Sequence, residues 1–444
     1  MSDHDAARAA DAQHAEIGLQ PDGSVDPAFH TEHPEAQWFP KAGLGLFIHW
    51  GISSVHGGVD LSWGMMADTP WDKGSPTLTP NEYYALADRF TADAYDPRQW
   101  LEPAYRAGVR YAVLTTKHHD GFTLWPSEYG DLGVHTHLGG RDLVAPFVEA
   151  CRALDMKVGL YYSPPDWWFD RHVRNWRHRA ADGPPLDMDH QPMKALPGES
   201  EAHGKARGEL IRGQVDELLN RYGRIDLFWF DGKGEAERKG SAITNDLVRD
   251  LQPHIVINRR NPAGTPGDYD ASECRLPAFR PKGWFECCHQ WADGGWGYLR
   301  TERYKSAGWF LESLARLRSW DANFLPNVAP DRHGRLPTVA LERMDAVARW
   351  METGGESLFG VTGGPYPDQV NVPCTRRGDR VWYLHPPDGF AAPIRIRDCP
   401  RPQGVTLLRT GDVLPFSLRG SDLIIEIPLA LRKGIMDTVK VELG

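Results

Sequence analysis

Apolar runs that end in polar residues recur along this chain, and this pattern limits its possible folds more than any other feature. The stretch 224–232 follows a helix-like segment, is rich in aromatic and β-branched residues, and stops at Asp231 and Gly232. It predicts a buried strand of a parallel sheet. An acid at the carboxyl end of such a strand lies where barrel and open α/β enzymes place their chemistry. A cap or turn role for Asp231 is the alternative, and repetition of the pattern argues against it.

Predicted strands alternate with predicted helices over about 310 residues, which favours a parallel sheet closed into an irregular (β/α)8, TIM-like barrel. Seven strands can be placed, and the eighth is assumed or irregular; the stretch 267–273 looks like a loop. The strands are predicted at 45–51, 110–116, 157–163, 224–231, 254–260, 284–288 and 323–330. A loop with Trp63 and Trp71 precedes helices predicted at 80–90, 97–107, 142–154, 208–222, 241–251 (beginning at Ser241), 309–320 and 337–354.

The composition changes near each end of this region. Residues 1–34 are polar and predict a weakly ordered N-terminal arm, and 35–364 form the predicted barrel. Residues 365–444 carry short strand-like runs between Gly, Pro and Asp, which predicts a small C-terminal antiparallel β-sandwich. The charged stretch 176–206, rich in Pro, Gly and His, is either an excursion over the barrel mouth, such as a lid, or a disordered loop.

The bulk composition excludes several classes of function. The 444 residues carry a net charge of −10, so nucleic acid is not an expected partner. No apolar segment is long enough for a secretion signal or a membrane span, so a cytoplasmic location and no membrane partner are expected. The six cysteines form no CxxC pair and are expected to be free thiols. The 17 Trp residues mildly favour a carbohydrate ligand, because aromatic faces stack on sugar rings. A homo-oligomer is left open.

Closing the barrel brings the polar residues at the strand ends to one mouth. Imidazole, phenol and guanidinium groups hydrogen-bond the hydroxyls of a polyol, and indole rings supply apolar walls. Two carboxylates are the minimum for glycoside hydrolysis. The candidate polar residues are His49, His118, His119, Tyr161 or Tyr162, Asp231, Arg260 and Glu273, and the candidate walls are Trp63, Trp229 and Trp296.

Metal and nucleotide chemistry are the competing uses of such residues. His118 and His119 are adjacent, and successive residues of a strand face opposite ways, so we expect them not to share an ion. No HxH or HExxH motif occurs, and no glycine-rich phosphate loop follows a predicted strand. We therefore expect no metal and no cofactor.

Six motifs, in order, resemble the α-L-fucosidases of glycoside hydrolase family 29 over residues 36–360. They are Phe47-Ile48-His49-Trp50-Gly51, Thr116-Lys117-His118-His119-Asp120-Gly121-Phe122, Gly159-Leu160-Tyr161-Tyr162-Ser163, Trp229-Phe230-Asp231, Trp296-Gly297-Tyr298 and Asn327-Val328-Ala329-Pro330. The resemblance implies an irregular barrel followed by a β-sandwich, a retaining mechanism, and a substrate with a terminal α-L-fucosyl group. It implies Asp231 as nucleophile. It also implies that the sugar subsite is lined by His49, His118, His119, Tyr161 in preference to Tyr162, Trp229, Arg260 and Trp296.

The acid/base is less closely specified, because its position varies within that family. Glu273 fits the pattern of an acid two positions after a small residue, Ala271, and Glu286 is the second candidate. Either glutamate could instead pair with Arg275 or Arg280. Separated pKa values are expected for the catalytic pair, with that of the acid raised by partial burial.

One departure from the family pattern affects the sugar. The family usually carries Glu-Trp after the first strand, where the Glu holds sugar hydroxyls, whereas this chain has Ser62-Trp63. Asp60 and Asp68 are the candidate substitutes. The departure keeps two alternatives open: an inactive carbohydrate-binding protein on the same scaffold, and a glycosidase for another α-L-sugar such as L-galactose.

Overall fold

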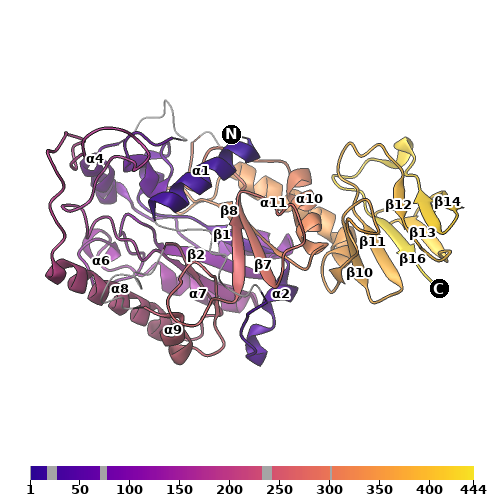
Figure 1. Ribbon diagram of the computed structural model, residues 1–444, viewed down its shortest axis with the longest axis horizontal. Coiled ribbons are helices and arrows are strands. Elements are labelled where there is room, and N and C mark those ends of the chain that lie inside the picture. The colour runs from indigo at the N-terminus through magenta and orange to yellow at the C-terminus, as the bar shows by residue number, and fades with distance from the viewer. Residues whose placement is uncertain (1, 18–27, 71–77, 233–242, 301–302) are drawn as a thin grey trace.

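The computed structural model describes residues 2–17, 28–70, 78–232, 243–300 and 303–444. Trp71 and the predicted helix start at Ser241 lie outside these residues, as does part of the predicted N-terminal arm. The described chain forms a barrel and, beside it, a smaller all-β unit at the C-terminus (Figure 1).

An eight-stranded sheet forms the barrel, and every adjacent pair in it is parallel. The strand order is β5-β4-β3-β2-β1-β8-β7-β6. A single parallel bridge between Asn258 and Tyr269 links the two outer strands and nearly closes the sheet. The predicted barrel is thus confirmed. Its strands are β1 Gly45–Ile48, β2 Tyr111–Lys117, β3 Lys157–Tyr162, β4 Leu227–Phe230, β5 Val256–Ile257, β6 Tyr269–Glu273, β7 Trp284–Gln290 and β8 Asn323–Val328.

Strands β1, β2, β4, β5 and β8 are buried along their whole length, because both faces of the sheet are covered. Along β1, Phe47 belongs to a buried cluster inside the barrel, whereas Leu46 and Ile48 belong to the cluster between the sheet and the helices. This alternation follows from the two-residue repeat of a strand. The interior is therefore packed with side chains, and a ligand can enter only at an end.

The prediction that 267–273 is a loop is wrong, because Tyr269–Glu273 is the eighth strand, β6. Its sequence is Tyr-Asp-Ala-Ser-Glu, and only Tyr269 is buried. The strand is held by its pairing with β7 and not by an apolar run. Such a strand lacks the signal on which sequence patterns rely. As a result, Glu273 stands at the carboxyl end of a barrel strand.

Helices between the strands cover the outside of the barrel; α7, for example, packs on β2 and β3. Asp142 caps α7 as predicted, because its Oδ1 accepts the N–H groups of Val144 and Ala145. The helices are α2 Phe39–Ala42, α3 Ser53–His56, α4 Pro80–Tyr84, α5 Arg98–Arg106, α6 Val134–His137, α7 Val144–Ala153, α8 Glu201–Arg221, α9 Asn245–Leu251, α10 Ala307–Arg318 and α11 Thr338–Gly354. The 3-10 helices are η1 Pro34–Ala36, η2 Leu61–Met65, η3 Ala85–Arg89, η4 Gly355–Ser357 and η5 Leu429–Leu431.

The C-terminal unit is antiparallel, as predicted. A five-stranded sheet of order β13-β16-β11-β10-β9 and a three-stranded sheet of order β12-β15-β14 share one apolar core. The strands are β9 Thr362–Gly363, β10 Cys374–Arg377, β11 Val381–Leu384, β12 Ile394–Ile396, β13 Gly404–Leu407, β14 Phe416–Arg419, β15 Asp422–Ile425 and β16 Val439–Glu442. The domain limits at residues 34 and 364 stay predictions.

The N-terminal arm contains a regular helix, α1 Asp3–Glu16, which the sequence was not expected to form. Ser2 caps it, and Ser2 and Asp5 form a capping box. Ala6 and Ala7 of α1 belong to the same apolar cluster as the barrel interior. The helix therefore lies against one end of the barrel (Figure 1).

All six cysteines are free thiols, as expected, and all six are buried. None of the helices in the described parts of the chain combines the length and the apolar character that crossing a bilayer requires.

Asp268 joins the two strands of the barrel that share only one bridge. Its side chain is fully buried, Oδ2 accepts the N–H of Ile257 in β5 (2.8 Å), and Oδ1 accepts Nη2 of Arg249 (3.0 Å). Its own N–H donates to the carbonyl of Ile257 (2.6 Å). A carboxylate thus supplies the hydrogen bond that a longer strand would have provided.

We predict that Asp268→Ala lowers the free energy of unfolding by about 3–5 kcal/mol, because it leaves the buried N–H of Ile257 without its acceptor and removes the carboxylate that pairs with the partly buried Arg249. Asp270→Ala is the matched control. Its carboxylate is half-exposed and pairs with Arg259, so a loss of less than about 1 kcal/mol is expected. Urea denaturation of both variants measures the difference. Equal midpoints for the two variants would contradict the role of Asp268.

Candidate active site

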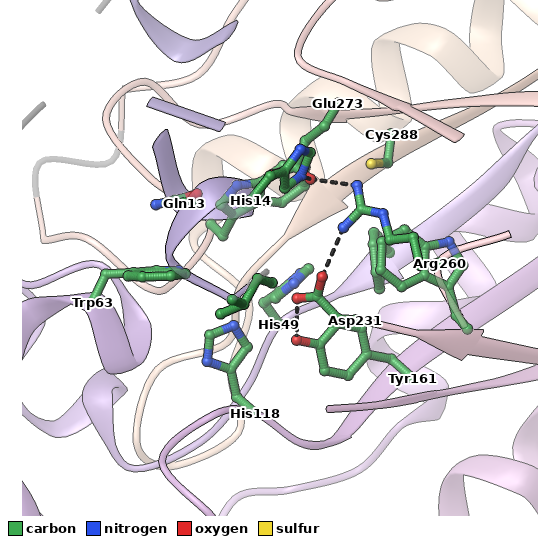
Figure 2. A pocket seen from close by; sticks show the side chains of 14 residues that line it. Gln13, His14, His49, Trp63, His118, Tyr161, Asp231, Arg260, Glu273 and Cys288 are labelled. Atoms are coloured by element: carbon green, nitrogen blue, oxygen red, sulfur yellow. Dashed lines mark hydrogen bonds and ion pairs between the residues drawn. The ribbon is translucent and has the colours of Figure 1, made fainter. Parts of the chain in front are cut away.

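A pocket at the carboxyl ends of the barrel strands gathers most of the predicted site residues (Figure 2). The space among its side chains is about 340 Å³, including the part open to solvent. Of the predicted residues, those that line it are His49, Trp63, His118, Tyr161, Trp229, Asp231, Arg260, Glu273 and Trp296. Strand ends far apart in the sequence thus meet at one mouth, as the polar-end pattern predicted.

Asp231 follows β4 directly and is held by two donors. The hydroxyl of Tyr161 donates to Oδ2 (2.6 Å), and Nη1 of Arg260 donates to Oδ1 (2.7 Å). Tyr161 is thus the tyrosine of the site, whereas the hydroxyl of Tyr162 faces away and donates to Gln214 (2.8 Å). A carboxylate fixed through both oxygens keeps one orientation toward the pocket.

Arg260 joins the two candidate catalytic carboxylates. Its Nη2 donates to Oε2 of Glu273 (2.6 Å), while Nη1 holds Asp231, as the dashed lines in Figure 2 show. Its guanidinium also lies 4.4 Å from the ring centre of Trp229. One guanidinium therefore bridges the two carboxylates, and glycosidases likewise carry out hydrolysis with a pair of carboxylates in one site.

Glu273 has a second partner that the sequence did not predict. Nε2 of His14, on helix α1, lies 2.6 Å from the same Oε2. Burial raises the pKa of Glu273, but the charges and hydrogen bonds of His14 and Arg260 outweigh it and hold the pKa well below its usual range. The expectation that burial would raise the pKa of this acid is therefore wrong for the free protein.

Three histidines at the strand ends, His49, His118 and His119, are neutral near pH 7. Burial lowers the pKa of His49 to about 4 and lowers the pKa values of His118 and His119 well below the usual range. Nδ1 of His49 donates to Oδ1 of Asn327 (2.6 Å), which leaves Nε2 as an acceptor for a hydroxyl. Neutral imidazoles suit a neutral sugar.

His119 does not line the pocket, in contrast to the prediction. It lies behind Asp231, with Nε2 3.6 Å from Oδ2, and its Nδ1 is 2.6 Å from the hydroxyl of Ser163. Its ring stacks on Trp167. His119 therefore contacts Asp231 on the side of the carboxylate that faces away from the pocket.

The expectation that His118 and His119 point apart is also wrong. Strand β2 ends at Lys117, so both residues lie in the following turn, where strand alternation no longer applies. One ligand atom each from His118, His119 and Asp231 lie within 4.8 Å of one another and could hold a metal ion. Arg260 already pairs with Asp231, and its positive charge disfavours a metal ion beside this carboxylate.

Ser62, at the position of the family's glutamate, contacts His118 instead of filling a sugar-binding role itself. Its hydroxyl lies 2.5 Å from Nδ1 of His118 and accepts the N–H of Asp120 (2.9 Å). Neither proposed substitute lines the pocket: Asp60 accepts the N–H groups of the loop at 296–297, and Asp68 pairs with Arg177.

Glu286, the second candidate for the acid, lies beneath the site. Its carboxylate is fully buried and accepts the hydroxyl of Tyr111 (2.6 Å) and the indole N–H of Trp229 (2.9 Å). Burial raises its pKa to about 7. It does not line the pocket, and it holds Trp229 from behind. Neither Glu273 nor Glu286 pairs with Arg275 or Arg280, whose partners are Asp11 and Asp321.

Five lining residues were missed by sequence reasoning: Gln13, His14, Ile17, Phe47 and Cys288. Phe47 could have been found, because it lies two residues before His49 and so faces the same side of β1. The residues of the N-terminal segment could not, since no local pattern indicates that this segment docks on the barrel mouth. No residue of 176–206 lines the pocket, so the lid interpretation has no support there.

Comparison with known proteins agrees with the motifs. A family model described as Alpha-L-fucosidase matches residues 23–356. The chain belongs to the alpha-L-fucosidase family. Tissue alpha-L-fucosidase of Rattus norvegicus is 28% identical over 374 residues, which cover 79% of this chain and 74% of the rat protein. Membership makes this chain a glycoside hydrolase, as its carboxylates predicted.

Solved alpha-L-fucosidase structures share the fold. Alpha-L-fucosidase isoenzyme 1 from Paenibacillus thiaminolyticus is 27% identical with a TM-score of 0.74, covering 93% of this chain and 99% of that one. The Thermotoga maritima alpha-fucosidase in complex with a mechanism-based inhibitor is 26% identical with a TM-score of 0.69, covering 93% and 97%. The barrel followed by antiparallel sheets is therefore a property that this chain shares with other alpha-L-fucosidases.

Proposed function

We propose that this alpha-L-fucosidase releases a terminal α-L-fucosyl group by double displacement, with Asp231 as nucleophile and Glu273 as acid/base. The observation that carries the proposal is the pair of carboxylates on one guanidinium at the barrel mouth. Membership of the alpha-L-fucosidase family supports the substrate, and the mechanism-based inhibitor bound by the Thermotoga maritima relative supports a reactive residue in such sites.

In the first step, an oxygen of Asp231 attacks the anomeric carbon and the bond to the leaving group breaks. The leaving oxygen takes a proton from Glu273. In the second step, Glu273 accepts a proton from water as that water displaces Asp231, and the sugar leaves with its configuration retained. Because two inversions occur at one carbon, the overall stereochemistry is unchanged.

The hydrogen bonds of the site prepare Glu273 for the second step more than for the first. An ionised Glu273, as His14 and Arg260 hold it, is ready to act as a base in the second step. For the first step it must be protonated, and substrate binding favours this by removing water from the carboxyl group. Tyr161 and Arg260 each donate to Asp231, so they stabilise it as the leaving carboxylate of the second step.

Around the sugar, the pocket offers acceptors and aromatic faces. His49 presents a free nitrogen, and Phe47, Trp229 and Trp296 form apolar walls. Such walls suit the methyl group of a 6-deoxy sugar. The inactive carbohydrate-binding alternative has no support, because both carboxylates stand in the pocket.

The proposal predicts that Asp231→Ala lowers kcat for an aryl α-L-fucoside by about 10⁴-fold or more, because the covalent route is lost. Substrate still binds, since the walls and His49 remain. Asp270→Ala, which removes a half-exposed carboxylate from β6, is the control and keeps full activity. Initial rates on aryl α-L-fucoside and α-L-galactoside substrates test both the residue and the sugar. An Asp231→Ala enzyme that retains more than about a tenth of wild-type kcat would refute the assignment.

The acid role of Glu273 predicts a dependence on the leaving group. In Glu273→Ala, kcat/KM falls by about 10²–10⁴-fold for a sugar leaving group that needs protonation, and by less than about tenfold for α-L-fucosyl fluoride, which does not. In the wild type, kcat/KM declines as pH rises above the pKa of Glu273. Since His14 and Arg260 lower this pKa, the alkaline limb starts on the acid side of neutrality.

Glu286→Gln is the control for this prediction, since it changes a carboxyl group that lies beneath the pocket. It is expected to change kcat/KM by a similar factor for both leaving groups. If Glu286→Gln showed the leaving-group dependence and Glu273→Ala did not, the two roles would have to be exchanged.

A further inference from the structure

Helix α1 places two polar side chains in the pocket, although it lies outside the part of the chain that matches the family. The match begins at residue 23, whereas α1 ends at Glu16. Gln13 and His14 are nevertheless among the lining residues (Figure 2). Neither the two catalytic steps nor the contacts with the fucosyl ring involve Gln13.

Contacts along its whole length hold α1 on the barrel. Near its start, Oδ2 of Asp3 accepts the indole N–H of Trp309 (3.1 Å), and Ala6 and Ala7 pack into the barrel cluster. At its end, Glu16 accepts the N–H of Arg179 (3.0 Å). In between, His14 contacts Glu273. The helix is thus docked as a wall of the pocket.

Gln13 has the features of a binding residue. It is 4% exposed, yet within the described residues its side-chain amide has no hydrogen-bond partner. Its amide oxygen and nitrogen are accessible from the pocket that the residue lines, so a ligand there can supply hydrogen bonds that the protein does not. Figure 2 shows this amide on the same side of the pocket as Trp63 and away from Asp231.

The position of α1 relative to the two carboxylates identifies what Gln13 would meet. In a retaining enzyme, the leaving group departs on the side of the acid/base and away from the nucleophile. His14 bonds Glu273, so α1 lies on the acid/base side. Gln13, which lines the pocket from this helix, therefore lies on the side where the leaving group departs.

We propose that helix α1 forms the leaving-group subsite of this enzyme, with Gln13 as the residue that hydrogen-bonds the hydroxyls of the leaving sugar. His14 is a positioning residue, which fixes α1 against Glu273 so that the Gln13 amide is in place. The proposal rests on the fucosidase function and on Glu273 as acid/base. It makes leaving-group preference a property of an N-terminal helix that lies outside the family's matched region.

The test compares two substrates with the same sugar and different leaving groups: an α-L-fucosyl disaccharide and α-L-fucosyl fluoride. Gln13→Ala raises KM for the disaccharide by about 3- to 10-fold, the value of one neutral hydrogen bond, and leaves KM for the fluoride unchanged. His14→Ala, which removes the contact between α1 and Glu273, shows the same selective rise. Arg8→Ala and His4→Ala, exposed on the same helix, are the matched controls and change neither KM.

An equal change of KM for both substrates in Gln13→Ala would show contact with the fucosyl ring and overturn the leaving-group assignment. No change for either substrate would overturn any binding role for Gln13. The failure of the underlying function is separate from both, because a wild-type enzyme that hydrolyses neither substrate would refute the fucosidase proposal itself. Circular dichroism of each variant verifies that the fold is intact.

Discussion

The structure depends on one guanidinium held between two carboxylates. Arg260 donates to Asp231 and to Glu273, and its own pKa is raised: burial lowers it, but the charges of the two acids outweigh burial. Without this cation, two buried carboxylates would repel each other, and one would take up a proton. His49, His118 and His119 are neutral, so the positive charge that permits an acid pair in this pocket comes from Arg260, together with His14 at Glu273.

The barrel builds this arrangement at its least regular point. Arg260 follows β5, only two residues long, and Glu273 ends β6, which joins β5 by one bridge. The sheet has few backbone hydrogen bonds there, so side chains link the strands instead. Asp268 accepts a backbone N–H of β5, and Asn258 bonds both the N–H and the carbonyl of Phe230 in β4. The irregular seam leaves room for Arg260 to turn toward both acids.

The sequence predicted what apolar runs and strand-end residues can specify: the parallel barrel, the antiparallel unit and most of the pocket. It could not specify β6, whose polar sequence is held by its neighbour β7. It placed Glu286 among the acids, because only the fold reveals that this carboxyl group lies under Trp229. It missed α1, whose docking depends on distant partners such as Trp309. These misses share one cause, since each depends on tertiary contacts that no local pattern records.

The central claim is that Asp231 becomes covalently bound to the sugar while Glu273 serves the leaving group and the water. A 2-fluoro-fucosyl fluoride measures this directly, because the fluorine at C2 slows both steps whereas the good leaving group, fluoride, keeps the first step fast enough for the covalent ester to accumulate. Peptide mass spectrometry of the inactivated enzyme is predicted to find one fluorosugar ester, on Asp231. An ester on Glu273 or another carboxylate, or steady turnover of the fluoride without any ester, would contradict the account.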